Sequence, residues 1–247
     1  MLIEYLKKYW VIVSLTALLL TACGLPVRFT EVRGSGQLAT IMRPLPAINA
    51  VELDGVGKLV IQQGERTSLE ITAEDNLINY LKTVPRGTSL HIFIEDHVNL
   101  RPTGEIIYRL TVEDLRRVTA GGLGQIEIHP LKVDRLDVRL SGNNSVVINE
   151  LAADRFSLDA SGLGDIEITG SVDSQDVRIS GMGNYEAGSL RSRKALVDIS
   201  GAGSALLWVT DAMNAKLSGA GNIQYYGSPV VSADISGAGS VTNLGEK

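Results

Sequence analysis

Histidine and serine side chains are the first candidates for metal binding or covalent catalysis in this sequence. The three histidines, His91, His97 and His129, stand apart in the chain, and none has a second ligand at the spacing of a metal site. Repeated Ser-Gly-x-Gly tetrapeptides place several serines at equivalent positions, whereas covalent catalysis needs one serine activated by a nearby base. No G-x-S-x-G elbow or phosphate-binding loop occurs. We therefore expect no catalytic residue, no metal ligand and no cofactor.

Carboxylates raise the possibility of sugar cleavage or of calcium binding. Asp159, Asp198 and Asp234 occupy equivalent positions in a repeat, and β-helical polysaccharide lyases and hydrolases place acidic groups on one outer face. Basic residues fall between these aspartates, which keeps them ionised and unsuited to act as general acids. A calcium-binding nonapeptide needs G-G-x-G-x-D, and one segment, Gly162-Leu-Gly164-Asp165, comes near it. A lyase or hydrolase is therefore the less favoured alternative.

The single cysteine, Cys23, excludes a disulfide framework and points to export instead. Two lysines precede an apolar run over residues 11–20, which is too short to span a bilayer of about 30 Å. A basic segment followed by a short apolar run is typical of an export signal. The run ends in Leu20-Thr21-Ala22-Cys23, which resembles the lipobox of bacterial lipoproteins. The resemblance implies a signal peptide over residues 1–22 and acylation of Cys23, with palmitate among the acyl chains.

The residues after Cys23 predict where the anchor would place the protein. Two or more acyl chains anchor a protein stably, so the membrane is the first expected partner. Gly24 stands where an inner-membrane retention signal would place Asp, which by resemblance to diderm lipoproteins favours the outer membrane. Residues 23–45 are rich in Pro and Gly, and we expect them to form the lipidated cysteine and a tether.

A repeat dominates the chain from residue 121 onward. Its tetrapeptides are separated by 20, 20, 19, 20, 18 and 18 residues. They are Gly121-Gly-Leu-Gly124, Ser141-Gly-Asn-Asn144, Ser161-Gly-Leu-Gly164, Ser180-Gly-Met-Gly183, Ser200-Gly-Ala-Gly203, Ser218-Gly-Ala-Gly221 and Ser236-Gly-Ala-Gly239. A slightly variable period of this size suits one coil of a solenoid.

The residues around each tetrapeptide predict strands on both sides of a corner. Apolar residues recur one and three positions before the serine and five positions after it, with polar residues between them. This alternation indicates strands with one buried face, and the glycines would supply the positive φ of a tight corner. The expected fold is all-β: one parallel β-helix over residues 46–247, with about 18–20 residues per coil. It is expected to be less regular at 58–120, with a short helix or turn within 75–84.

Charge alternates in sign at the position two residues before each serine. If the coils stack, neighbours in this column lie roughly 4.8 Å apart, and alternation avoids like-charge contacts. Each exposed pair would contribute only about 0–1 kcal/mol, so the expected role is to fix register, with a charged strip for a ligand as the alternative. The serine column likewise predicts either stacked hydroxyls or a polar ligand surface. The charge ladder consists of Arg139, Asp159, Arg178, Asp198, Lys216 and Asp234.

Composition excludes several classes of protein. Of the 247 residues, 44% are hydrophobic, which is enough to build a core and excludes wholesale disorder. The 26 glycines lack a three-residue period, which excludes collagen. A formal charge of −5 with few basic clusters argues against nucleic acid as a partner.

Several segments together resemble a known family. They are Val51–Ile61, the turn at 74–77, Leu90–Glu95 and the Ser-Gly-Ala-Gly-Asn-Ile segment at 218–223. In this order behind a lipobox they resemble the head GIN domain family, described as "putative autotransporter adhesins". The resemblance covers roughly residues 46–245. It implies a single parallel β-helix and brings no catalytic motif.

These observations together favour a non-catalytic, lipid-anchored cell-envelope protein. We expect an adhesin or binding scaffold that presents an extended solenoid surface to a glycan or a surface protein. The alternative is a structural or regulatory envelope protein that associates with itself as a homo-oligomer. That alternative follows from the final strand near Asn243-Leu244, where no capping helix is visible and an open coil end would expose backbone groups.

Overall fold

The structure is a computed structural model that describes residues 30–247. The predicted signal peptide, the lipobox and Cys23 therefore lie outside the described residues. Within the described part of the chain, no helix has the length and apolar character needed to cross a membrane.

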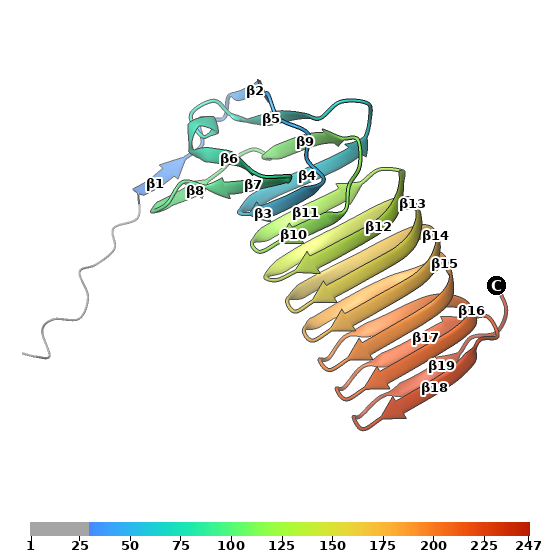
Figure 1. Ribbon diagram of the computed structural model, residues 1–247. Coiled ribbons are helices and arrows are strands. Elements are labelled where there is room, and N and C mark those ends of the chain that lie inside the picture. The colour runs from blue at the N-terminus through green and yellow to red at the C-terminus, as the bar shows by residue number, and fades with distance from the viewer. Residues whose placement is uncertain (1–29) are drawn as a thin grey trace, which may run out of the picture.

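The chain forms a β-solenoid of about six turns, as the repeat predicts (Figure 1). Each coil has one strand that leads into the Gly-rich corner and one that leaves it. The strands that enter the corner at either end of the stack are β3 (Ala50–Asp54), β10 (Arg117–Ala120), β12 (Leu131–Leu140) and β18 (Val230–Ile235). Those that leave it are β4 (Val56–Gln63), β11 (Leu123–Ile128), β17 (Asn222–Tyr226) and β19 (Ser240–Asn243).

Four long strands form the middle of the stack. Each leaves one Gly-rich corner, continues round the opposite side of the coil and enters the next corner, so it contributes to both faces. They are β13 (Asn143–Ala160), β14 (Leu163–Ile179), β15 (Met182–Ile199) and β16 (Ser204–Leu217). All pairings from β3 and β4 down to β18 and β19 are parallel.

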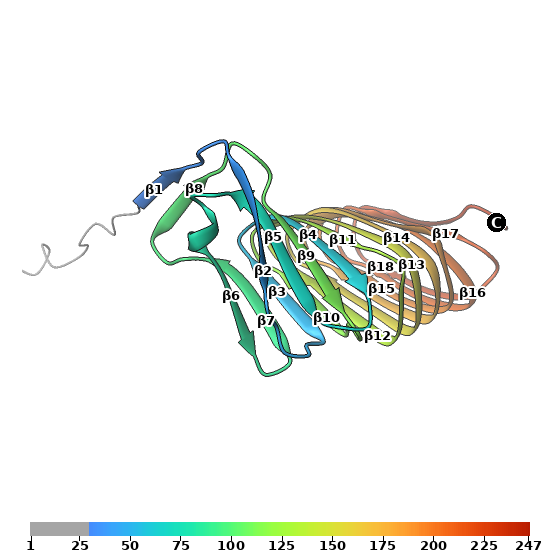
Figure 2. The same cartoon turned by 90° about the horizontal axis from the view of Figure 1, so that it is seen from above.

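The N-terminal end of the stack is covered by strands that are partly antiparallel. β7 and β9 continue the stack in parallel beside β3 and β4, and β6, β5 and β2 then add antiparallel pairs (Figure 2). These elements are β2 (Leu38–Arg43), β5 (Ser68–Glu74), β6 (Leu81–Arg86), β7 (Ser89–Ile94), β9 (Ile107–Val112) and the short 3-10 helix η1 (Ile78–Tyr80). The antiparallel pairs make this part less regular than the coils that follow, and η1 lies within the predicted turn.

Part of the predicted tether is folded. β1 (Thr30–Arg33) pairs in parallel with β8 (Val98–Arg101), and β2 pairs antiparallel with β5. Both β1 and β2 lie inside the range 23–45, so this part of the predicted tether contains two paired strands. Proline and glycine in the range suggested a linker, but the short alternating runs between them find partners far away in the chain.

The predicted inward positions form the core. The column one residue before the corner is buried from Leu53 to Leu217, and the column five residues after the serine is buried from Leu59 to Ile223. The last coil is the exception, because no further coil covers it: Ile235 is 45% exposed. Burial of aligned apolar side chains from successive coils is the main stabilising contribution in such a stack.

Most corner glycines are needed for a reason other than the predicted positive φ. Among them only Gly57, Gly142 and Gly164 have positive φ. At most of the others, an added Cβ would lie closer than 3.0 Å to the carbonyl oxygen of the equivalent residue one coil earlier. Parallel stacking of tight corners therefore requires glycine because neighbouring backbones approach closely, and only at a few positions because of its left-handed conformation.

One buried polar network lies inside the solenoid. The Tyr185 hydroxyl donates to Gln175 Oε1 at 2.9 Å, Gln175 Nε2 donates to Ser192 Oγ at 2.7 Å, and Ser192 Oγ donates to the Trp208 carbonyl at 3.0 Å. All three side chains are buried. Burial raises the pKa of Tyr185, which keeps its hydroxyl protonated as a donor. The chain of bonds satisfies these polar groups and ties three successive coils together.

Candidate binding face

The charge ladder lies in register but does not form the expected ion pairs. Arg178 has Asp159 and Asp198 as its register partners, and the remaining members pair along the stack in the predicted order. Among residues 30–247, however, no two neighbours of the ladder approach within 4.0 Å, and Arg178 instead pairs with Asp176 at 3.1 Å. Because the ladder residues are aligned but do not touch, only a long-range electrostatic interaction remains between them. The predicted role of the ladder in fixing register therefore stays a prediction.

The other residues singled out from the sequence do not gather in one place. His129 Nε2 lies 3.4 Å from Glu127 Oε1, and the His91 ring stacks on Phe93 with a centroid distance of 4.6 Å. Ser141 and Ser161 donate weakly to carbonyls of the preceding coil, at 3.4 and 3.3 Å, so their hydroxyls cross-link coils. Within the described chain, no group of three or more His, Cys, Asp and Glu side chains could hold a metal ion.

The face formed by the strands that leave the corner carries a column of polar side chains that the sequence analysis did not single out. We call it the polar column. It stands four residues after each corner serine, is exposed or half-buried throughout, and runs the length of the stack. Its members are Lys58, Gln125, Ser145, Asp165, Asn184, Ser204, Asn222 and Ser240. The aligned repeats of the sequence contain this column, because every repeat has a polar residue four positions after the corner serine or its equivalent.

Side chains of the polar column interact with each other in places. Asn184 Nδ2 donates to Asp165 Oδ1 at 2.9 Å, and Ser240 Oγ donates to Asn222 Oδ1 at 3.1 Å. Amides and hydroxyls can both donate and accept hydrogen bonds, so the column offers a regular series of both kinds of group to an extended ligand.

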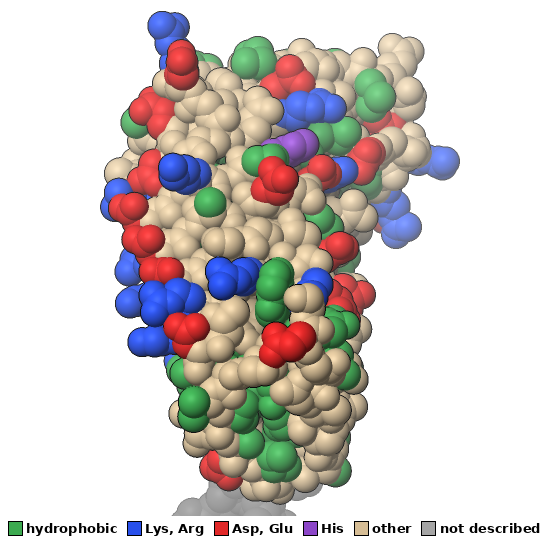
Figure 3. Space-filling view, turned by 90° about the vertical axis from the view of Figure 1, so that its right-hand side faces the viewer, with side chains coloured by type: hydrophobic (Ala, Val, Ile, Leu, Met, Phe, Trp, Pro, Cys, Tyr) green, Lys and Arg blue, Asp and Glu red, His purple; other side chains and the backbone are tan. Residues whose placement is uncertain are grey.

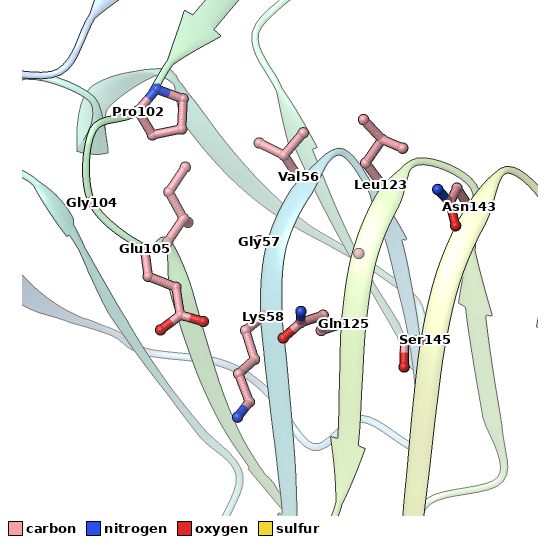
Figure 4. A pocket seen from close by; sticks show the side chains of 12 residues that line it. Val56, Gly57, Lys58, Pro102, Gly104, Glu105, Leu123, Gln125, Asn143 and Ser145 are labelled. Carbon is pink, nitrogen blue, oxygen red and sulfur yellow. The ribbon is translucent and has the colours of Figure 1, made fainter. Parts of the chain in front are cut away.

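A groove with a volume of about 430 Å³ opens at the N-terminal end of the polar column. One wall is the β8–β9 loop with Pro102, Gly104 and Glu105, and the other is formed by the first coils (Figure 4). Lys58, Gln125 and Ser145 line it from neighbouring strands. Gly57 lets the loop approach, because a Cβ there would lie 2.8 Å from the Ile106 carbonyl oxygen. The groove is therefore where the flat polar face becomes concave.

Lys58, which lines the groove, forms an ion pair with Glu127 beside it. Lys58 Nζ lies 2.8 Å from Glu127 Oε2, and both side chains are about one-third exposed, at 32% and 31%. The hydrogen bond with Glu127, followed by its charge and that of Glu105, raises the pKa of Lys58, and the same bond lowers the pKa of Glu127. The groove is thus lined by the Lys58 ammonium and the Glu105 side chain, with the amide of Gln125 and the hydroxyl of Ser145 on neighbouring strands.

The loop that forms the outer wall is held by a buried carboxylate. Glu74 Oε2 accepts from the Thr103 N–H at 2.9 Å, and Glu74 Oε1 accepts from the Thr103 hydroxyl at 2.5 Å and from the Gly36 N–H at 2.7 Å. These bonds, that of the Thr103 hydroxyl above all, lower the pKa of Glu74 to about 2. Glu74 therefore positions the wall and stays ionised over the whole physiological range.

Exposed apolar side chains form a rim beside the polar column. They occupy the x position of the corners, where Leu123 is 60%, Leu163 47% and Met182 59% exposed. Val56 and Leu123 are register partners at the mouth of the groove, and the later coils have alanine at this position. Apolar contact beside hydrogen-bonding groups is the usual composition of a ligand-binding surface.

Most of the chain matches a known protein family. Residues 47–229 match the family described as "Putative auto-transporter adhesin, head GIN domain". The chain belongs to this family. The resemblance inferred from the sequence is thereby confirmed, and with it the single solenoid over the matched residues.

Solved structures share the fold of this head GIN protein. A "putative adhesin" from Bacteroides fragilis is 24% identical, with a TM-score of 0.82 over 86% of this chain and 100% of that one. A "putative adhesin" from Parabacteroides merdae is 28% identical, with a TM-score of 0.69 over 87% and 99%. A "putative lipid binding protein" from Parabacteroides distasonis is 24% identical, with a TM-score of 0.74 over 87% and 100%. None of the curated proteins gives a match.

Proposed function

We propose that this head GIN protein is a non-catalytic binding protein of the cell envelope that attaches to an extended glycan through its polar column and groove. The observation that carries the proposal is the column of amide, hydroxyl and charged side chains that continues from coil to coil into the groove. A ligand with a repeating set of hydroxyl groups can form one weak contact per coil, and many such contacts add to useful affinity.

A glycan array tests this proposal. We expect the protein to bind a subset of bacterial or host polysaccharides, and the double variant Gln125→Ala, Asn184→Ala to lose at least ten-fold in affinity. Lys216→Ala is the matched control. Lys216 lies on the face formed by the strands that enter the corner, so its substitution should leave glycan binding unchanged. Absence of binding to every glycan and matrix protein would refute the proposal. Cleavage of any bound glycan would refute the non-catalytic part of it.

The lipid anchor is a second part of the proposal. The sequence supports it through the apolar run and the Leu-Thr-Ala-Cys motif that ends at Cys23. Expressed in a diderm bacterium, the protein should be found in the outer-membrane fraction and carry acyl chains on Cys23 that mass spectrometry detects. Cys23→Ser should abolish acylation and leave the chain unprocessed. An unmodified Cys23 on the wild-type protein would contradict the anchor.

Self-association is the alternative role, and the open end of the stack favours it. β18 pairs only with β16, and β19 only with β17, within the described chain. Val230 is 79%, Ile235 45% and Leu244 40% exposed there, and hydrophobic side chains gather over the last coils on the side seen in Figure 3. An unpaired edge beside exposed apolar groups is a template for strand pairing.

Size-exclusion chromatography with light scattering over a hundred-fold range of concentration tests the alternative. Self-association predicts a mass that rises with concentration in the wild type, and a monomer for Ile235→Asp. A monomer at every concentration would contradict the structural role while leaving the glycan proposal intact.

A further inference from the structure

Lys247 lies over two aromatic rings on the same face as the polar column. Its Nζ is 5.3 Å from the centroid of the Trp208 ring and 5.4 Å from that of Tyr226, within the range of cation–π attraction. It donates to the Gly188 carbonyl and, at 3.3 Å, to Ser189 Oγ. The ammonium group thus has rings beside it and two oxygen acceptors in front of it.

The segment that carries Lys247 is held in place by the last coil. The Leu244 N–H donates to the Tyr225 carbonyl at 2.8 Å, and the Gly227 N–H donates to the Gly245 carbonyl at 2.9 Å. From there the lysine side chain reaches across the coil of Trp208 to that of Gly188. Its position is set by backbone pairing rather than by the ammonium contacts alone.

The carbonyl acceptor comes from an irregularity in the stack. The register of β15 shifts against both neighbours here, and neither β14 nor β16 gives Gly188 a register partner. Its carbonyl is therefore outside the ladder and available to a side chain. Bulges of this kind commonly re-aim groups at binding sites.

The groups around Lys247 suit a cation. A hollow of about 220 Å³ beside it is lined by the carboxylates Glu167 and Glu186, by the hydroxyls of Thr169 and Ser189, and by Tyr226. Carboxylates, a carbonyl and ring faces all attract positive charge, and the hydroxyls can accept hydrogen bonds from an ammonium group.

We propose that this place is a binding site for a primary ammonium group, which Lys247 occupies in cis and from which a lysine side chain of a partner peptide displaces it. The contacts of Lys247 define what fits: an ammonium on an unbranched alkyl stem, with N–H groups for Gly188 and Ser189. Because Lys247 is tethered, it competes at high effective concentration, and an external lysine binds the unoccupied site more tightly than the occupied one.

Trp208 reports on this site. The chain has two tryptophans, and in the full chain with Trp10→Phe only Trp208 remains. This Trp10→Phe protein is the parent for the variants below. Lys247→Met keeps the alkyl stem and removes the ammonium group, so we expect the Trp208 fluorescence emission of this variant to differ from that of the parent. The probe is Nα-acetyl-lysine N-methylamide, which should bind Lys247→Met at least ten-fold more tightly than the parent. The norleucine analogue, which lacks the ammonium, should not bind.

Lys216→Met is the matched control, because it removes a lysine from the other face and should behave as the parent does. Choline separates a primary ammonium from cation–π attraction alone, since it has no N–H to donate and should bind at least ten-fold more weakly. Equal binding of the lysine and norleucine probes, equal binding of choline, or unchanged emission in Lys247→Met would each overturn the proposal. The site shares no lining residue with the groove, so such a result would leave glycan binding by the groove untouched.

Discussion

At the scale of single residues, close approach between coils explains the glycine pattern better than backbone conformation does. From Gly122 onward, the glycine at the position after the corner serine lies against the carbonyl oxygen of the equivalent glycine one coil earlier, so a Cβ at this position would clash with the backbone. Asn144 replaces a glycine in one coil, does not have positive φ, and is nevertheless buried. Its Nδ2 donates to the Ser141 carbonyl at 2.6 Å, which satisfies part of the buried amide.

Gly201→Ala should destabilise the protein by about 2–3 kcal/mol, because its Cβ would lie closer than 3.0 Å to the backbone of Gly181 and overpacking forces the coils apart. Gly121→Ala is the control, since its Cβ meets nothing nearer than 3.4 Å and it occupies a position where other coils have serine. Urea unfolding of the two variants measures the difference. Equal midpoints would contradict the close-approach explanation.

Glu74 should make the stability of the protein depend on pH. Its pKa is lowered to about 2 from an ordinary 4.5, so its contribution is fully present above about pH 4.5 and is lost as pH falls through 2. Glu74→Gln should therefore have a lower urea midpoint than the wild type at pH 7, and the difference should shrink towards pH 2. A difference that stays constant with pH would show that ionisation of Glu74 is not involved.

At the scale of elements, the stack is organised by columns, and each face has its own. The strands that enter the corner carry the charge ladder, whereas those that leave it carry the polar column, the apolar rim and the Lys247 site. The bulge in β15 interrupts this regularity where Gly188 leaves the ladder. The regular coils therefore form the extended polar surface, and an irregularity such as the bulge at Gly188 forms a local site on it.

Asp198→Lys should test whether the charge ladder contributes to register. The new lysine would lie between Arg178 and Lys216 and create two like-charge neighbours, so we expect a loss of about 0.5–1 kcal/mol that added salt reduces. Asp198→Asn is the control that removes the charge without reversing it. Urea unfolding at low and high salt measures both, and a loss independent of salt would argue against an electrostatic role.

At the scale of the whole molecule, the two ends of the solenoid differ. The N-terminal end is covered by β2, β5, β6 and β9, and the apolar side chains of β5 and β9 are largely buried, whereas the last coil leaves inward-facing side chains exposed. In a solenoid each coil is stabilised mainly by its neighbours, so a coil with one neighbour is the least stable.

Hydrogen exchange should reveal this difference. Amides of β18 and β19 should exchange at least ten-fold faster than those of β13 and β14, because local opening begins at the uncovered end. Mass spectrometry of peptides from each coil measures the rates. Equal protection in a sample at micromolar concentration would contradict fraying and would indicate that a second copy covers the end.

The sequence was enough to predict the solenoid, its period, the inward columns and the family, because each coil repeats the same local alternation and stacking converts that period directly into contacts. Contacts between distant or irregular segments became visible only in the folded chain. The fold is not encoded by the repeat at these places. There, β1 and β2 pair with strands far along the chain, the β8–β9 loop lies over the first coils, and Lys247 reaches Gly188, 59 residues away. The ladder residues are also aligned without touching, because side-chain rotamers and local partners, not register alone, decide which charges meet.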